Sequence, residues 1–266
     1  AMHNAAFKEL GLELEYVPFE VEPEDLGEAL NGMRALHVVG FNVTVPHKET
    51  VVPLLDEVTK LARTIGAVNT VENSGGTLIG YNTDGQGFIE SLKEDADFEP
   101  KGKKIVVLGA GGASRAVAVM LTEVGAKALV ITDLLEDKAK ELAEYLDAYE
   151  KTSCQFLRLN SPDLPAAVAE ADLLVNATPI GMRPKVADSP LPAKCKLKKN
   201  TLVYDLVYTP AETKLLKSAK AAGCRACSGL GMLVRQGALA FTVFTGEEAP
   251  IEVMRQAAEQ ALRIGG

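Results

Sequence analysis

The feature that most constrains this chain is a strand, turn and helix pattern near its middle. A short apolar run from Ile105 to Leu108 enters a glycine-rich turn and then an Ala/Val-rich stretch that ends near Leu121. Such a run is typical of a buried parallel strand. Glycines allow positive φ and close approach of the backbone, so the free N–H groups that open the helix can bind a pyrophosphate. The pattern predicts a dinucleotide-binding fold that begins near residue 100.

The turn and the following strand indicate which residues would bind the dinucleotide. We expect the turn to contact it through Gly109, Gly111, Gly112, Ala113 and Ser114, with Ser114 at the position where the usual pattern has a third glycine. A second apolar strand, Ala128 to Thr132, ends at Asp133, about 20 residues further on, where an acidic residue receives the adenosine ribose. The alternative is that Asp133 only caps the next helix.

The residues around Asp133 favour NAD over NADP. A carboxylate accepts hydrogen bonds from ribose hydroxyls and repels a 2′-phosphate. Leu134 and Leu135 follow it, with no arginine, and the nearest downstream cation is Lys138 in a solvated helix. NAD is therefore the preferred cofactor on electrostatic grounds, with NADP as the alternative.

Composition and charge narrow the class of protein. The chain has 266 residues, 47% of them hydrophobic, which is enough for two packed domains. No apolar run approaches the ~20 residues of a membrane span, and no basic segment leads into an apolar one at the N-terminus. A net charge of −8 without a basic cluster argues against nucleic acid. We expect a cytoplasmic monomer or homodimer whose partners are small molecules, with neither nucleic acid nor membrane bound.

The cysteines do not predict a metal site. Only Cys224 and Cys227 are in a Cys-x-x-Cys arrangement, and the three histidines all lie in the first half of the chain, far from the cysteines in sequence. Reduced, structural thiols are the expected state.

The order of apolar segments predicts two α/β domains. We place a substrate-binding domain at residues 1–95, with 237–266 packing back on it, and a Rossmann-like, doubly wound cofactor domain at 96–236. The polar run Glu94 to Lys104 is the predicted linker. The elements expected in the first domain are a helix to about Leu10, a strand Glu13 to Phe19, a helix Pro23 to Met33, and strands near Val38 and Leu78. Those expected afterwards are strands at Ile105, Ala128, Leu173, Thr201 and about Arg225, and a last helix from Ile251 to Ile264.

A lysine in the first domain is a candidate for proton transfer. The run Gly40 to Glu49 is predicted to pass from an extended stretch into a helix starting near Pro46, which would place Lys48 in the first helical turn. The positive end of the helix dipole, with partial burial, would favour the neutral amine and suit it to proton transfer. The alternative is a lysine that projects into water beside Glu49.

A second loop supplies a possible partner for Lys48. It leaves a strand near Gly80 and enters a helix predicted at Phe88 to Glu94, with Asp84 between them. Asp84 either caps this helix or faces a ligand, since open α/β sheets bind ligands beyond the carboxyl ends of their strands. None of the six tyrosines has a lysine four residues later, and the cofactor half has no histidine. A Lys/Asp proton relay therefore remains.

Seven segments together resemble the shikimate dehydrogenase family, including its quinate/shikimate-oxidising relatives, over almost the whole chain. They occur in the family's order: Met2–Phe7, Gly40–Lys48, Gly66–Thr70, Tyr81–Gly85, Gly109–Ser114, Asn176–Met182, and Gly229–Leu233 with Gln236.

The resemblance implies reversible reduction of 3-dehydroshikimate to shikimate with a nicotinamide cofactor, in the route to aromatic amino acids. Lys48 and Asp84 match the family's catalytic pair. The positions that match substrate ligands or lie near the substrate are Thr44, Asn69, Tyr208 and Gln236. The positions expected to border the cofactor are Asn176, Thr178, Met182, Gly229 and Met232, although Met232 is equally compatible with core packing. Tyr204 is expected in the core.

Two departures from the family pattern have consequences. The family normally has another strand and a Ser-x-Ser-Pro loop before the Met-His-Asn segment, where this chain begins at Ala1. We expect a protein without them to bind substrate weakly and to have a less stable first domain. NADP-type members carry Asn-Arg-Thr where this chain has Asp133-Leu134-Leu135, which supports the NAD preference.

Two alternative functions stay open at this point. One is NAD-dependent quinate/shikimate oxidation in catabolism, which requires room for the extra hydroxyl and saturated ring of quinate. The other is a non-catalytic sensor of metabolite and dinucleotide. The presence of both Lys48 and Asp84 argues against the sensor, because a pure binder needs no proton relay.

Overall fold

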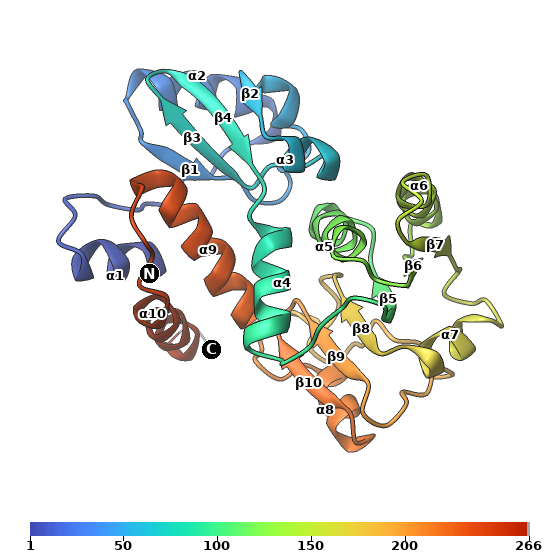
Figure 1. The fold of residues 1–266 in the computed structure, drawn as a ribbon. Coiled ribbons are helices and arrows are strands. Elements are labelled where there is room, and N and C mark those ends of the chain that lie inside the picture. Colours follow the sequence, from blue (N-terminus) through green and yellow to red (C-terminus); the bar gives the residue numbers. More distant parts are fainter. Residues whose placement is uncertain (265–266) are drawn as a thin grey trace. The chain divides into compact units, whose positions relative to one another are not determined.

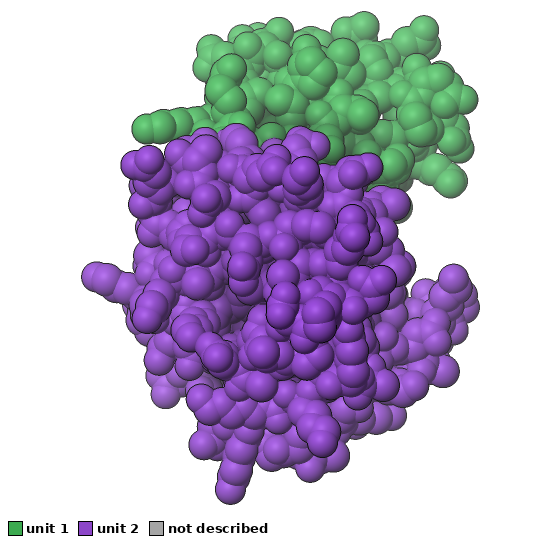
Figure 2. All heavy atoms as spheres, turned by 90° about the vertical axis from the view of Figure 1, so that its right-hand side faces the viewer, with its two compact units in different colours: residues 1–87, 233–265 green, residues 88–232, 266 purple. Residues whose placement is uncertain are grey.

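The computed structural model describes residues 1–264 and divides them into two compact units (Figures 1 and 2). Among the described residues, unit 1 contains Ala1–Gly87 and 233–264, and unit 2 contains Phe88–Met232. Two helices pass through the boundaries, α4 (Asp84–Glu94) and α9 (Leu230–Thr245). The first unit is thus assembled from the two ends of the chain.

Unit 2 is built on a six-stranded sheet in which every neighbouring pair is parallel. Its strands are β5 (Lys104–Leu108), β6 (Ala128–Thr132), β7 (Ser153–Phe156), β8 (Leu173–Asn176), β9 (Leu202–Asp205) and β10 (Arg225–Ser228). The spatial order is β10-β9-β8-β5-β6-β7, so the order reverses between β5 and β8. Open sheets of this kind bind ligands at such a reversal, beyond the carboxyl ends of the strands.

The helices of unit 2 follow the strands, as a doubly wound fold requires: α5 (Gly112–Glu123), α6 (Glu136–Asp147), α7 (Leu164–Glu170) and α8 (Lys214–Ala221). Strands β8 and β9 are buried at every position, as expected from their mainly apolar residues, and each ends in a buried polar residue, Asn176 or Asp205. Tyr204 in β9 is fully buried, as expected for a core residue. The predicted Rossmann-like fold of this half is confirmed.

Unit 1 contains a smaller mixed sheet in the order β1-β3-β4-β2. Its strands are β1 (Gly40–Asn42), β2 (Glu57–Val58), β3 (Thr70–Ser74) and β4 (Thr77–Tyr81); β3 is antiparallel to β1 and β4, and β2 is parallel to β4. The helices are α1 (Met2–Glu9), α2 (Leu26–Ala35), α3 (Lys60–Ile65) and α10 (Ile251–Ile264), with short 3₁₀ turns η1 (Pro23–Asp25) and η2 (Val52–Leu54). Helix α10 lies against α1, as the sequence pattern predicted for the C-terminal helix.

Three predicted elements of unit 1 are wrong or misplaced. Glu13–Phe19 forms no strand, because its backbone pairs with side chains instead: the N–H of Tyr16 donates to Asn4 Oδ1 at 2.6 Å. No helix starts at Pro46; the chain makes successive turns from Val45 to Val51. The helix expected from Phe88 begins earlier, at Asp84. The elements that were not predicted from the sequence include the short β2, β3, β7, α3 and η2 and the long helix α9.

Candidate active site and cofactor turn

The turns around Lys48 hold its backbone against the strand-forming part of unit 1. The N–H of Val68 donates to the Lys48 carbonyl at 2.8 Å, and the N–H of His47 donates to the Thr44 carbonyl at 2.8 Å. Because no helix forms here, the helix dipole expected at Lys48 does not act on it. What acts on its ammonium instead is a carboxylate.

That carboxylate belongs to Asp84, the first residue of α4. The side chain of Asn82 caps this helix, accepting from the N–H groups of Asp84 at 3.1 Å and Gly85 at 3.4 Å. Asp84 is therefore free of the capping role that was its alternative. Its Oδ2 lies 2.7 Å from Lys48 Nζ, and the side chains of Asp84 and Lys48 are 8% and 17% exposed.

A buried amide completes the surroundings of Asp84. Asn69 Nδ2 donates to Asp84 Oδ1 at 3.0 Å and to Thr83 Oγ1 at 2.9 Å. The same Nδ2 lies 3.2 Å from Gln236 Oε1. The two amide hydrogens of Asn69 are therefore shared among three acceptor oxygens. Residue 87 is glycine where the backbone of α9 comes close; a Cβ there would lie 2.6 Å from Gln236 N. The structure thus brings Lys48, Asp84, Asn69 and Gln236 together.

Two predicted substrate-binding residues are not part of this cluster. Thr44 is exposed in unit 1, four residues before Lys48, and its carbonyl caps the turn at His47. Tyr208 lies in unit 2, after β9, and is 38% exposed. Both side chains are open to solvent in the structure.

The glycine-rich turn joins β5 to α5 in unit 2. Gly109 has φ +115°, in the region that favours glycine, and an added Cβ would lie 3.0 Å from the Ala177 backbone. Gly111 precedes α5, is exposed, and would place a Cβ in open space, with no atom within 4 Å. Ser114 Oγ donates to the Gly109 carbonyl at 2.5 Å and so fixes the turn to the helix. Gly112 and Ala113 form the first turn of α5, whose N–H groups have no intrahelical partner.

Asp133 connects this turn to the end of the neighbouring strand. Its Oδ2 accepts from the N–H of Ala110 at 2.7 Å, and its Oδ1 accepts from the N–H of Leu135 at 2.8 Å. Leu134 and Leu135 are 73% and 61% exposed. The predicted ribose-binding carboxylate therefore also shapes the glycine-rich turn.

The loop after β8 carries three of the predicted cofactor residues. Asn176 is fully buried, and its Oδ1 accepts from Thr178 N at 3.0 Å and from Thr178 Oγ1 at 2.7 Å. Met182 is 45% exposed. Asn176 Nδ2 in turn donates to Asp205 Oδ1 at 2.8 Å. Asp205 was not among the residues predicted from the sequence, where its only signal is an acidic residue at the end of an apolar strand.

The remaining predicted cofactor residues lie where α9 begins. Gly229 passes so close to the Leu206 carbonyl that any Cβ would collide with it. Met232 is 8% exposed, so its side chain is largely packed inside the protein.

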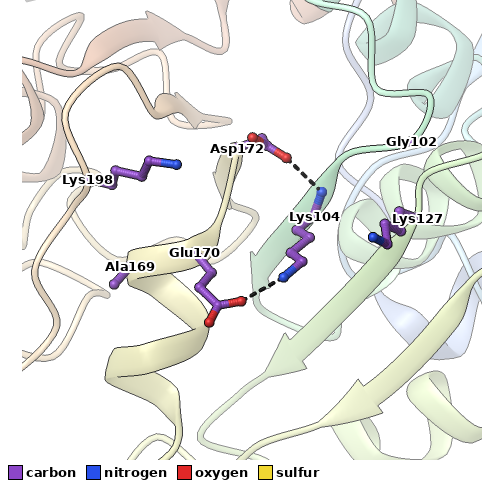
Figure 3. A pocket seen from close by; sticks show the side chains of 7 residues that line it. All are labelled: Gly102, Lys104, Lys127, Ala169, Glu170, Asp172 and Lys198. Carbon is purple, nitrogen blue, oxygen red and sulfur yellow. Dashed lines mark hydrogen bonds and ion pairs between the residues drawn. The ribbon is translucent and has the colours of Figure 1, made fainter.

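Two hollows in unit 2 lie away from the glycine-rich turn. One, of about 480 Å³, lies at the amino ends of the strands and is lined by Gly102, Lys104, Lys127, Ala169, Glu170, Asp172 and Lys198 (Figure 3). Lys104 is tied to both acidic residues there, through its ammonium to Glu170 at 2.6 Å and through its N–H to Asp172 at 3.0 Å. The other, of about 870 Å³, is lined by Arg183, Pro184, Val186, Ala187, Pro210, Glu212, Lys214 and Lys217. The first hollow is thus at the opposite edge of the sheet from the carboxyl ends, where sheets of this kind bind ligands.

The described part of the chain has neither a metal-binding cluster nor a membrane-spanning helix. Within residues 1–264, no three His, Cys, Asp or Glu side chains are grouped so that they could hold a metal ion. In the same range no helix has the length and apolar character needed to cross a bilayer.

Comparison with known protein families covers most of the chain. Residues 1–71 match the shikimate dehydrogenase substrate binding domain, residues 91–206 match the shikimate/quinate 5-dehydrogenase model, and residues 229–259 match the shikimate 5′-dehydrogenase C-terminal domain.

Individual proteins are similar over nearly their full length. A shikimate dehydrogenase (NADP(+)) of Methanopyrus kandleri is 49% identical over 99% of this chain and 91% of its own. The structure of shikimate 5-dehydrogenase from Thermus thermophilus, in complex with NADP(H) and shikimate, has a TM-score of 0.88 at 39% identity and covers 98% of this chain and 93% of its own. That of Listeria monocytogenes, in complex with shikimate and NAD, has a TM-score of 0.88 at 35% identity and covers 97% of this chain and 90% of its own.

The parallel sheet with its glycine-rich turn, and the buried lysine–carboxylate pair, define a nicotinamide-dependent oxidoreductase. The chain belongs to the shikimate dehydrogenase family.

Proposed function

We propose that this protein catalyses the reversible reduction of 3-dehydroshikimate to shikimate, in the route to aromatic amino acids. The observation that carries the proposal is the 2.7 Å contact between Lys48 Nζ and Asp84 Oδ2 in a largely buried setting. The similar proteins are named shikimate dehydrogenases. Lysine and aspartate side chains can both take part in proton transfer, which the interconversion of a hydroxyl and a carbonyl requires.

The lysine and the aspartate would handle the proton of the substrate hydroxyl. In the oxidation direction one group of the pair accepts the proton as the carbonyl forms; in the reduction it returns a proton to the developing alkoxide. Their mutual contact keeps both polar groups satisfied without substrate, so burial of the pair carries a smaller desolvation penalty than burial of either ion alone. Asn69 would keep Asp84 oriented by donating to its second oxygen.

The substrate hydroxyls require several hydrogen-bonding side chains. We assign this role to Asn69 and Gln236, which already lie beside Asp84, and to Thr44. Tyr208 is assigned a place near the substrate on the family resemblance, and its exposure leaves the phenol available. A polar set of this kind discriminates a polyhydroxylated ring from analogues that lack a hydroxyl, because an unpaired buried group is costly.

The glycine-rich turn fits a nicotinamide dinucleotide. The open space at Gly111, next to the free N–H groups of Gly112 and Ala113 at the start of α5, suits a pyrophosphate. Asp133 would accept from the adenosine ribose, and Asn176, Thr178, Met182, Gly229 and Met232 would border the rest of the cofactor. When bound, the nicotinamide supplies or accepts the hydride.

For the choice of dinucleotide we propose NAD. Asp133 is followed by two exposed leucines, and the first turn of α6 adds the acidic residues Glu136 and Asp137. Arg158, a cation near this edge, is already paired with Glu136 at 2.9 Å. A 2′-phosphate would meet negative charge here. The names of similar proteins carry NADP(+), which favours NADP, so the proposal of NAD rests on the residues of this chain's own turn alone.

The proposal is tested by initial rates of shikimate oxidation with NAD and with NADP at equal concentrations. We expect turnover with both and a higher kcat/KM with NAD. A higher kcat/KM with NADP would agree with the proposed dehydrogenase activity but would refute the NAD preference argued from Asp133. The absence of turnover with either, together with measurable binding of shikimate, would contradict the proposed function and favour a metabolite sensor.

The same assay separates a biosynthetic from a catabolic enzyme. Quinate is supplied in place of shikimate, because its additional hydroxyl and saturated ring need extra room. We expect kcat/KM for quinate to be far below that for shikimate. Comparable values would favour the NAD-dependent quinate/shikimate oxidation of catabolism.

A further inference from the structure

Asp205 is a buried carboxylate at the carboxyl end of β9, and it is absent from the residues that sequence reasoning selected. Its side chain is fully buried. Burial raises the pKa of its carboxyl group, while hydrogen bonds from Thr213, Val207 and Asn176 act in the opposite direction. A carboxyl group is almost never fully buried unless other groups pair with it or donate hydrogen bonds to it, because burial without such partners is costly.

The partners of Asp205 come from three separate parts of the chain. Its Oδ1 accepts from Asn176 Nδ2 at 2.8 Å and from Val207 N at 3.1 Å. Its Oδ2 accepts from Thr213 Oγ1 at 2.6 Å, and Thr213 caps helix α8 by accepting from Leu216 N. One carboxylate therefore connects the loop after β8, the turn after β9 and the start of α8.

The connection continues from Asn176 into the loop after β8. Asn176 Nδ2 also donates to the Ile180 carbonyl at 3.2 Å, and its Oδ1 holds both the N–H and the hydroxyl of Thr178. Thr178 Oγ1 in turn accepts from Ile180 N at 3.2 Å. The conformation of residues 176–180 thus depends on one amide whose orientation Asp205 fixes, because only one orientation of that amide directs Nδ2 at the carboxylate.

We propose that Asp205 is a positioning residue, which holds the loop carrying Thr178 and Met182 and the turn carrying Tyr208 in one arrangement at the carboxyl edge of the sheet. The proposal rests on the proposed function, which assigns Thr178 and Met182 to the cofactor and Tyr208 to the substrate. Asp205 touches neither ligand, and it acts by preorganising the backbone of both loops.

The first experiment compares Asp205→Ala with the wild-type protein by dinucleotide titration, hydrogen exchange and steady-state kinetics. Loss of the carboxylate frees the Asn176 amide, so we expect Kd for the dinucleotide to rise about tenfold or more and kcat/KM for shikimate to fall about 10- to 100-fold. Hydrogen exchange of residues 176–182 should become faster, although this segment lies about 25 residues from the substitution in sequence.

Thr201→Val is the matched control. Thr201 is also buried, at the other end of β9, and its hydroxyl donates to the Ala171 carbonyl at 3.0 Å. The variant loses one buried hydrogen bond at the amino edge of the sheet. We expect its Kd and kcat/KM to stay within about twofold of wild type, even where its stability falls.

A milder variant keeps the test decisive if Asp205→Ala does not fold. Asp205→Asn keeps the size of the side chain but has one acceptor oxygen in place of two, so it cannot accept all three hydrogen bonds that the carboxylate accepts from Asn176, Val207 and Thr213. We expect Kd to rise and hydrogen exchange of residues 176–182 to quicken in this variant too, by a smaller factor than in Asp205→Ala. The proposal is overturned if the folded variants leave Kd and exchange unchanged, or if Thr201→Val loses as much. Because titration and exchange need no turnover, these outcomes are distinct from a failure of the proposed function, in which the wild-type protein itself would not oxidise shikimate.

Discussion

The ammonium of Lys48 and the carboxylate of Asp84 lie 2.7 Å apart although 36 residues separate them in the chain. Two features of unit 1 bring them together. The Lys48 carbonyl accepts from Val68 N, next to Asn69, and Asp84 begins the helix that follows β4. Asn69 spans the two, because its amide donates to Asp84. The local fold therefore holds the pair before any ligand binds.

Asp84→Asn should reduce turnover with little change in dinucleotide binding. The amide keeps the shape of the side chain, but it cannot accept or return a proton and no longer balances the charge of Lys48. We expect kcat for shikimate oxidation to fall by about 10²- to 10⁴-fold, the usual contribution of general acid–base catalysis. Asp56→Asn, at an exposed ion pair with Arg34 in the same unit, is the control. Turnover within tenfold of wild type in the Asp84 variant would contradict a proton-transfer role.

Gly111→Ala should weaken dinucleotide binding and leave the fold intact. The position has a negative φ of −79° and no atom within 4 Å of an added methyl group, so alanine is compatible with the unliganded backbone. The methyl group would occupy the space proposed for the pyrophosphate, and we expect Kd to rise about tenfold or more, at least roughly 1.4 kcal/mol. Gly27→Ala, in α2 and likewise without neighbours, should leave Kd unchanged. If the Gly111 variant and the wild-type protein bind the dinucleotide with equal affinity, the turn is not part of the binding site.

Asp133→Asn with Leu134→Arg should shift the cofactor preference towards NADP. Asparagine retains one acceptor oxygen, which can bind the backbone N–H of either Ala110 or Leu135 but not both, and arginine supplies a guanidinium for a 2′-phosphate. The ratio of kcat/KM with NADP to that with NAD should rise about 100-fold, which corresponds to roughly 3 kcal/mol. In the control, Leu134→Met replaces Leu134→Arg and adds no charge. A ratio that does not move in the double variant would place the 2′-phosphate elsewhere.

His3 should make unit 1 less stable in mild acid. Its ring is 5% exposed, stacks on Tyr16 at 4.4 Å between centroids, and has a buried Nδ1 without a partner. Burial lowers its pKa from the ordinary 6.5 to about 4. Between these two values the unfolded chain binds a proton that the folded chain does not, so stability falls as the pH drops from 6.5 to 4 and is retained above 6.5.

The measurement is the free energy of unfolding in urea at pH 7.5 and pH 4. The contribution of His3 should reach at most roughly 3 kcal/mol, taking 1.36 kcal/mol per pKa unit. Carboxylates titrate in the same range, so the effect is read as the difference between wild type and His3→Phe, which cannot titrate. Identical slopes for wild type and His3→Phe would exclude a role for His3.

The sequence predicted those parts of the fold whose pattern is local. Ile105–Leu108 and its glycines read directly as a strand and turn, because a fully buried parallel strand is continuously apolar. Glu13–Phe19 alternates like a strand yet forms none, since a strand needs a partner that no local pattern reveals. Pro46 suggested a helix, but its surroundings form turns that position Lys48 through the contact with Val68.

The residues of the candidate site also fall into those that the sequence predicted and those that it did not. Lys48 and Asp84 were selected from the character of their loops, and the family resemblance then matched both. Asp205 was not selected, because its importance lies in three partners, two of them in other loops of the chain. The sequence shows an acidic residue at the end of a strand, but it does not show whether that side chain binds one loop or several. Only the hydrogen bonds of Asn176, Val207 and Thr213 identify it as a connection between loops.

The division of the chain into units also sets an order of events during synthesis. Unit 2 is a single continuous stretch, Phe88–Met232, so it can fold as soon as that stretch leaves the ribosome. Unit 1 begins earlier in the sequence, but it also includes most of α9 and all of α10, and α10 packs against α1. It is therefore complete only after these helices have been synthesised. Gln236, which meets Asn69 beside the Lys48–Asp84 pair, is thus among the last residues to arrive. A nascent chain that stalls before α9 would carry a folded cofactor unit and no finished catalytic cluster.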